Sequence, residues 1–289
     1  MIGAWASPPK RSRHPFGPMQ ASAIVAIVKR LRGLAQIVDL KSLLLSALAM
    51  LSTWLCLRLG LTADFPLTLI ATAVVFPLVF SISAAYRRRD SALEEYASLK
   101  AHGRALYFAA HDWLPESDNR GRTAEIEAAL GDLLHACRAL FTHPIDRMEG
   151  HERRVYAVFA RLSLFVERLR REGLAPNEVS RCNQYVSRIM LAFERLKHVY
   201  QYRTPRTLRA FGDFFIFLLP VLYGPYFAYQ AKEYGIGLLV YVMPVLFVLI
   251  LVGLDNIQSH LENPFDGIGE DDVAINAEKF IASLQGNRA

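Results

Sequence analysis

The sequence predicts an all-α membrane protein with four transmembrane helices in two hairpins and a helical cytoplasmic region. Three observations lead to this fold class. The 289-residue chain is 53% hydrophobic and 21% charged, whereas soluble domains average about 45–50% and about 25%. The apolar excess is concentrated in long uncharged stretches, and the remaining sequence has the periodicity of helices with one apolar face. Abundant apolar residues exclude a disordered chain, and three widely spaced cysteines exclude a disulfide scaffold.

Four stretches are long and apolar enough to cross a bilayer, which requires roughly 20 helical residues for a hydrocarbon core of about 30 Å. Uncharged runs of 22, 18 and 21 residues occupy 65–86, 214–231 and 234–254. The run 42–57 is shorter, at 16 residues. Because an arginine near a helix end can extend its charge to the interface, we expect this span to continue past Arg58 to about residue 63.

Short turns join these spans into two hairpins. The first hairpin occupies 41–86, and Pro66 in its turn suits the start of a helix. The second occupies 210–255, with its turn at 232–235. Its first helix is expected over 211–231.

Basic residues indicate the orientation of the spans. They cluster at the ends that lie away from the hairpin turns: Lys29, Arg30, Arg32, Lys41, Arg87, Arg88, Arg89, Arg203, Arg206 and Arg209. By the positive-inside rule, both termini and the middle region are cytoplasmic. We therefore expect a multi-pass protein of the cell (inner or plasma) membrane.

The segments outside the hairpins are expected on the cytoplasmic side. Residues 1–20 are basic and rich in proline, which predicts disorder. Residues 21–40 have an apolar face, which predicts either an amphipathic helix on the membrane surface or an ordinary packed helix. The region 87–209 is helical, and since no glycine or proline directly follows the second span, its helix can continue into 87–113. Residues 256–289 form a C-terminal segment.

The sequence offers little sign of enzyme chemistry. It contains no zinc-protease, nucleophile-elbow or phosphate-loop motif. One cluster of polar residues follows the last span and is the only candidate for an enzyme site: Asp255, His260, Glu262 and Asp266. An integral membrane enzyme built on this cluster is the weakest of the functional hypotheses. The uncharged runs also argue against a proton-coupled pump, which needs protonatable groups inside the bilayer. Nucleic-acid binding is not expected, because the arginines of the middle region alternate with acidic residues.

The second span carries an aromatic stripe. Thr72, Phe76 and Phe80 recur at intervals of four residues, flanked by small residues such as Ala73 and Ala84. Small flanking residues allow helices to approach closely. The stripe either packs against a neighbouring helix or, if the helix is repeated around an axis, forms rings that gate ion flow by dewetting.

Several motifs in order resemble the bestrophin family of ion channels. The stretch 66–92 (PLTLIATAVVFPLVFSISAAYRRRDSA) resembles the second transmembrane helix of bacterial members. The motifs E-R-L at 194–196, T-P at 204–205 and L-L-P at 218–220 follow. N-P-F at 263–265, with G-E-D-D after it, resembles an acidic signature of the family. The resemblance covers roughly 40–285, with 100–190 alike only in helical character.

This resemblance implies a homopentamer with one axial pore. Thr72, Phe76 and Phe80 match the neck positions, where relatives carry Ile or Phe, so the Thr72 hydroxyl is a departure that makes one ring more polar. The inner mouth of the pore would contain four residues: Ser83, Tyr86, Arg87 and Arg88. We expect an anion (chloride) channel; a cation-selective channel and a non-conducting membrane-anchored scaffold are the alternatives.

Relatives with a full acidic clasp bind Ca²⁺. The corresponding residues here are Asn263, Asp266, Glu270, Asp271 and Asp272. Three inserted residues and an acidic run that ends at Asp272 weaken this prediction, because Ca²⁺ takes six to eight oxygen ligands; a solvated loop is the alternative. No other cofactor is expected. The expected partners are further copies of the chain, the lipid bilayer and small monovalent ions.

Overall fold

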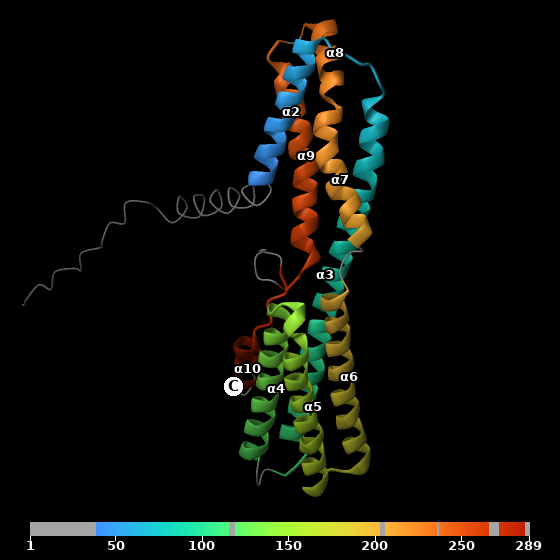
Figure 1. Cartoon of the computed structure of the whole chain (residues 1–289). Helices are drawn as coiled ribbons and strands as arrows, with labels where there is room; N and C mark the ends of the chain where they lie inside the picture. The colour runs from blue at the N-terminus through green and yellow to red at the C-terminus, as the bar shows by residue number, and fades with distance from the viewer. Residues whose placement is uncertain (1–38, 116–118, 203–205, 236, 266–271, 287–289) are drawn as a thin grey trace, which may run out of the picture. The chain divides into compact units, whose positions relative to one another are not determined.

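The computed structural model describes residues 39–115, 119–202, 206–235, 237–265 and 272–286. These residues form helices and connecting turns and contain no strand. The helices, shown in Figure 1, are α2 (Leu40–Leu59), α3 (Leu67–Asp112), α4 (Asn119–Thr142), η2 (Ile145–Arg147), α5 (Met148–Arg171), α6 (Pro176–Gln201), α7 (Arg206–Leu222), α8 (Gly224–Tyr234), α9 (Leu239–Glu262) and α10 (Ala277–Gln285). The all-α fold class is confirmed. The predicted disorder at 1–20 lies outside the described residues, as do residues 21–38 of the amphipathic segment predicted at 21–40.

Four helical stretches are long and apolar enough to cross a membrane, as predicted. They are Leu40–Leu59, Leu67–Asp112, Thr207–Tyr234 and Leu239–Glu262. The first is shorter than expected, since its helix ends at Leu59 rather than near residue 63. Gly60 adopts a left-handed φ of 70°, and its N–H closes the last turn on the carbonyls of Cys56 and Leu57. A left-handed residue after the last turn ends a helix, so Arg58 lies in the final turn, near the helix end as predicted.

The third span is interrupted, which corrects the prediction of one helix over 211–231. α7 ends at Leu222, and α8 begins at Gly224. Pro225 has no N–H to donate to the carbonyl of Val221, four residues earlier. The Ser52 hydroxyl of α2 donates to that carbonyl at 3.0 Å and so replaces the missing hydrogen bond. In an apolar environment an unsatisfied backbone carbonyl is costly, so this hydrogen bond reduces the energetic cost of interrupting the helix.

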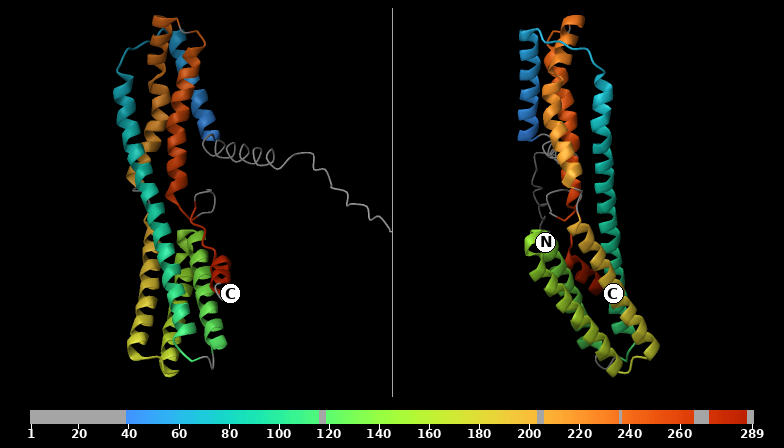
Figure 2. Two further views of the ribbon diagram at one scale, coloured as in Figure 1. Left: turned by 180° about the vertical axis from the view of Figure 1, so that it is seen from behind. Right: turned by 45° about the vertical axis from the view of Figure 1, so that its right-hand side comes forward.

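The chain divides into two compact units, and the first contains residues 39–65 and 219–256 among those described. Within it, α2 packs against α8 (Figure 2). A Cβ atom on Gly224 would lie 2.3 Å from the Ser52 Oγ, so this glycine is what permits the close approach. Lys41 of α2 donates to the Asp255 carboxylate of α9 at 2.8 Å.

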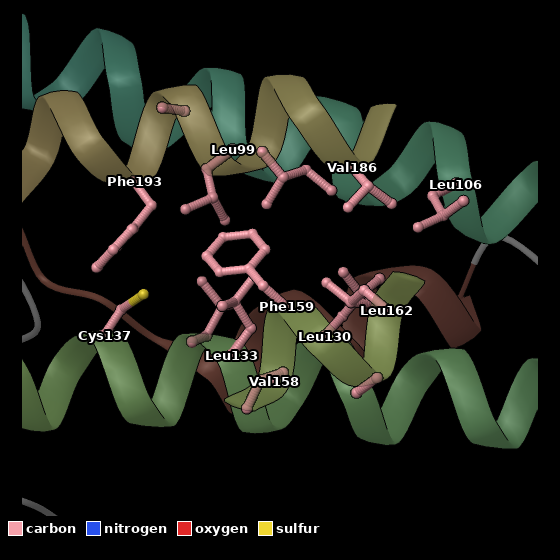
Figure 3. Packing of buried hydrophobic residues seen from close by; sticks show 14 of the residues in the cluster. Leu99, Leu106, Leu130, Leu133, Cys137, Val158, Phe159, Leu162, Val186 and Phe193 are labelled. Carbon is pink, nitrogen blue, oxygen red and sulfur yellow. The ribbon is translucent and has the colours of Figure 1, made fainter. Parts of the chain in front are cut away.

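The second unit contains residues 66–218 and 257–289, apart from those not described. The C-terminal half of α3 packs with α4 and α6, α5 packs between α4 and α6, and α10 lies against α4. Figure 3 shows Leu99 of α3, Leu133 of α4 and Phe159 of α5 pointing into one apolar interior. Cys137 and Cys182 are buried in this core as free thiols.

α3 runs without interruption through 46 residues, from the membrane span into the bundle. This confirms that the helix of the second span continues past residue 86. As far as Leu106, its buried residues follow spacings of three and four, with one step of seven from Ala85 to Ala92: Val74, Leu78, Ser81, Ala85, Ala92, Tyr96, Leu99, Gly103 and Leu106. Tyr107, Ala109 and Ala110 near its end are also buried. One face of α3 is therefore buried throughout, and the bundle fixes which face of the span is left uncovered.

Candidate pore-lining face of helix α3

The buried face of the α3 span packs on the N-terminal part of α7. Val74 and Leu78 are almost fully buried and line a small apolar cavity together with Phe211 and Ile216 of α7. Pro77 borders the same cavity and lacks the N–H that would bond the carbonyl of residue 73. The rotational position of the span is thus set by packing on this side.

The predicted neck residues lie on the opposite face. Thr72 is exposed, and the side chains of Phe76 and Phe80 are 59% and 58% exposed. The two rings meet edge to face, with centroids 4.6 Å apart and planes at 89°. Edge-to-face contact is a favourable geometry for aromatic pairs, so each ring restrains its neighbour.

The Thr72 hydroxyl is engaged within its own helix. It donates to the carbonyl of Thr68 at 2.6 Å, one turn earlier. A hydroxyl bonded back to the helix has less capacity to hold water. The departure from the apolar residues of relatives therefore changes the polarity of this position less than the residue type suggests.

The structure separates the four predicted inner-mouth residues. Ser83 and Arg87 lie on the neck face, and the Arg87 Nη2 donates to the Ser83 Oγ at 3.4 Å. Tyr86 is exposed but lies about 80° around the helix from Phe76. Arg88 is half-buried on the packed side, where its Nη1 donates to the carbonyl of Tyr202 after α6 at 3.1 Å. Only Ser83 and Arg87 thus share a face with the neck.

Two further residues, which were not predicted from the sequence, continue the face of α3 that carries Phe76 and Phe80. Asp90 and Glu94 follow Ser83 and Arg87 at spacings of three and four, and both side chains are exposed. Continuing the helical period of the aromatic stripe beyond residue 86 would have found them. The aromatic stripe ends with the apolar run, but the helix and this face of it continue.

The predicted calcium ligands lie mostly outside the described residues, which exclude Asp266, Glu270 and Asp271. On the near side of this segment, Phe265 stacks on Phe141 of α4 with ring centroids 4.7 Å apart. On the far side, the Val273 N–H donates to the Pro264 carbonyl at 2.7 Å. Among the described residues, no group of three or more His, Cys, Asp or Glu side chains could hold a metal ion. The calcium site stays a prediction.

Two members of the cluster considered for enzyme chemistry are paired with cations. Asp255 accepts from Lys41 at 2.8 Å, and Glu262 accepts from Arg209 at 2.7 Å. Asp266 lies outside the described residues.

Comparison with solved structures identifies the fold. Two crystal structures of a bacterial bestrophin homolog from Klebsiella pneumoniae superpose with TM-scores of 0.65 and 0.64, at 18% and 19% sequence identity. Each comparison covers 87% of this chain and 97% of the other. The chain has the bestrophin fold. A further membrane-protein crystal structure, of a leucine-to-alanine variant, matches at a TM-score of 0.67 and 15% identity, covering 84% of this chain and 98% of that chain.

No protein-family model and no curated protein matches the sequence. The bestrophin fold nevertheless confirms the resemblance that the sequence motifs indicated, over a comparable share of the chain. At these identities the likeness concerns the fold, so the role of each residue rests on its own position in α3.

Proposed function

We propose that this protein is a passive ion channel, a homopentamer in which five copies of α3 surround a single axial pore. The observation that carries the proposal is the exposed pair Phe76–Phe80, on the face of α3 opposite to the one buried in the chain. Bestrophins, which the chain resembles in its motifs and its fold, are ion channels. The neck of the pore would consist of Thr72, Phe76 and Phe80.

The composition of the exposed face supports a protein-lined axis. Phe76 and Phe80 are flanked by small residues, including Ala73 and Ala84. Small residues beside a bulky stripe let copies of a helix approach closely while the rings point inward. Farther along α3 the same face becomes polar at Ser83 and Arg87, which suits a passage that widens into water.

The neck would act as a hydrophobic gate. Rings of apolar side chains resist wetting and so control ion flow without binding the ion. The edge-to-face contact of Phe76 with Phe80 restrains the rings, and the Thr72 hydroxyl is bonded to the backbone of its own helix. Transport is passive, because the uncharged runs of the last three spans supply no protonatable carboxylate or lysine.

Orientation and ion selectivity are the finer parts of the proposal. The distribution of basic residues supports cytoplasmic termini and a cytoplasmic bundle, in a cell (inner or plasma) membrane. The anion preference expected from the sequence depends on arginines at the inner mouth. Arg87 lies on the neck face, but Arg88 is directed toward Tyr202, so support for an anion channel now comes from Arg87 alone.

The neck is tested by ion flux in liposomes. Replacing Phe76 and Phe80 together by Ala removes both rings and should increase flux, because a wider and less apolar neck wets more easily. The matched control is the double variant Phe214→Ala and Phe217→Ala on α7, whose side chains are equally exposed. Unchanged flux in the first variant, or an equal increase in the control, would contradict the neck assignment.

The competing hypothesis is a membrane-anchored helical scaffold that conducts nothing. It predicts the same spans but no closed ring. The mass of the detergent-solubilised particle distinguishes the two hypotheses. A pentamer supports the channel, whereas a monomer or dimer contradicts it.

A further inference from the structure

The neck face of α3 does not end at the aromatic rings, and its continuation carries charge. Ser83, Arg87, Asp90 and Glu94 follow Phe76 and Phe80 along one side of the helix. At a rise of about 1.5 Å per residue, Arg87, Asp90 and Glu94 lie about 10, 15 and 21 Å beyond Phe80 along the helix axis. They therefore form three successive charged levels on the path that leads away from the neck.

The negative charges on this face are not neutralised within the chain. Among the described residues, neither Asp90 nor Glu94 has a hydrogen bond or an ion pair, and both side chains are exposed. Their neighbour Glu95 differs, because it accepts from Arg195 of α6 at 2.8 Å and lies toward the packed side. Glu95, which points away from the neck face, is therefore held in an ion pair. Asp90 and Glu94, which lie on the neck face, are exposed.

Positive charge on the face is limited to one residue. Arg87 is exposed and bonds only to the Ser83 hydroxyl among the described residues. Arg88 and Arg89 are half-buried, and Arg88 is turned toward the carbonyl of Tyr202. Two carboxylates and one guanidinium give the face a net negative charge in each copy of the chain.

We infer that Asp90 and Glu94 make the inner vestibule of this pore favour cations over anions. The inference rests on the proposed function, since it needs α3 to face the axis. Repeated around an axis, each carboxylate becomes a ring, and rings of acidic side chains concentrate cations at a pore mouth. Arg87 opposes this effect next to the neck and lowers the preference without reversing it.

The test is the reversal potential of the full-length protein in planar bilayers under a salt gradient. The wild-type reversal potential should have the sign of a cation-preferring pore. Replacing both carboxylates (Asp90→Asn with Glu94→Gln) should lower the cation-to-anion permeability ratio by about fivefold, the scale of a single close charge interaction in water. The ratio should change more at low salt, because exposed charges are screened beyond about 8 Å at physiological ionic strength.

Two further variants keep the test decisive. Arg87→Gln should shift the ratio in the opposite direction, toward cations. Glu95→Gln removes the same charge as Glu94→Gln one residue away, but off the neck face, and should leave the ratio unchanged. All of these side chains are at least partly exposed, so the variants should fold like the wild type.

The outcomes distinguish this inference from the proposed function. A wild-type preference for anions, or conduction with a ratio unaffected by the double variant, overturns the cation inference and leaves the channel intact. An equal shift from Glu95→Gln also overturns it, since the effect would then come from overall surface charge. Absence of conduction in every variant, including Phe76→Ala with Phe80→Ala, overturns the proposed function itself.

Discussion

The two halves of α3 are one helix in two different environments. In the apolar, membrane-spanning part of α3 only 17% of the residues are buried within the chain, whereas 33–39% of the residues are buried in the other three spans. In the half that follows residue 90, a regular series of side chains is buried among α4, α6 and α10: Ala92, Tyr96, Leu99, Gly103, Leu106, Tyr107, Ala109 and Ala110. Most side chains of the first half are therefore not covered by the rest of the chain, whereas one face of the second half is packed into the bundle.

The largest expected effect comes from matched leucine substitutions in the two halves. Leu99 is 2% exposed in the bundle, and Leu69 is 69% exposed in the span. Leu99→Ala should lower the free energy of unfolding by about 2–5 kcal/mol, because it leaves a cavity in a packed core. Leu69→Ala should lower it by less, because this side chain is exposed and its truncation leaves no cavity within the chain. Thermal unfolding in detergent measures both, and equal losses would contradict the division between the halves.

A smaller effect is expected from pH, and it concerns the bundle half alone. Burial, with a lesser contribution from Arg188, lowers the pKa of His102 below its usual value of 6.5. Because the folded state disfavours the protonated imidazole, this residue's contribution to stability is complete above about pH 6.5 and is lost as the pH falls below that value. The melting temperature of the wild type should therefore fall more on acidification than that of His102→Gln. Parallel pH profiles for the two proteins would show that His102 plays no part.

The smallest effect is expected at the neck. Thr72→Val replaces the hydroxyl by a methyl group of similar size, and the hydroxyl is already bonded to the carbonyl of Thr68. Ion flux in liposomes should therefore stay at the wild-type level, and stability should change little. A clear drop in flux would mean that the hydroxyl wets the neck and that its bond to Thr68 breaks in the conducting pore.

Features that depend on local pattern were predicted well from the sequence. The uncharged runs located all four spans, and the absence of a helix breaker near Arg87 allowed the continuous α3. The period of Thr72, Phe76 and Phe80 placed them on one face, and all three are exposed on it. These results follow from hydrophobicity and helical geometry alone.

Features that depend on partners distant in sequence were not predictable. The interruption after Leu222 is tolerated because Ser52, 169 residues from Val221, satisfies the freed carbonyl. The different directions of Arg87 and Arg88 likewise depend on a carbonyl at the end of α6. No local pattern contains this information, because each contact is created when remote segments pack.

The unbroken course of α3 has a mechanical consequence. Its 46 residues span about 69 Å at the rise of an α-helix, so the helix can transmit a rotation from one end to the other. A rotation of the bundle half would turn the rings of Phe76 and Phe80 through a similar angle, apart from the part that the most compliant turn of the helix absorbs. The most compliant turn of α3 is the one ending at Pro77, where one backbone hydrogen bond is missing. That turn carries Phe76, so bending at this point would move the Phe76 ring.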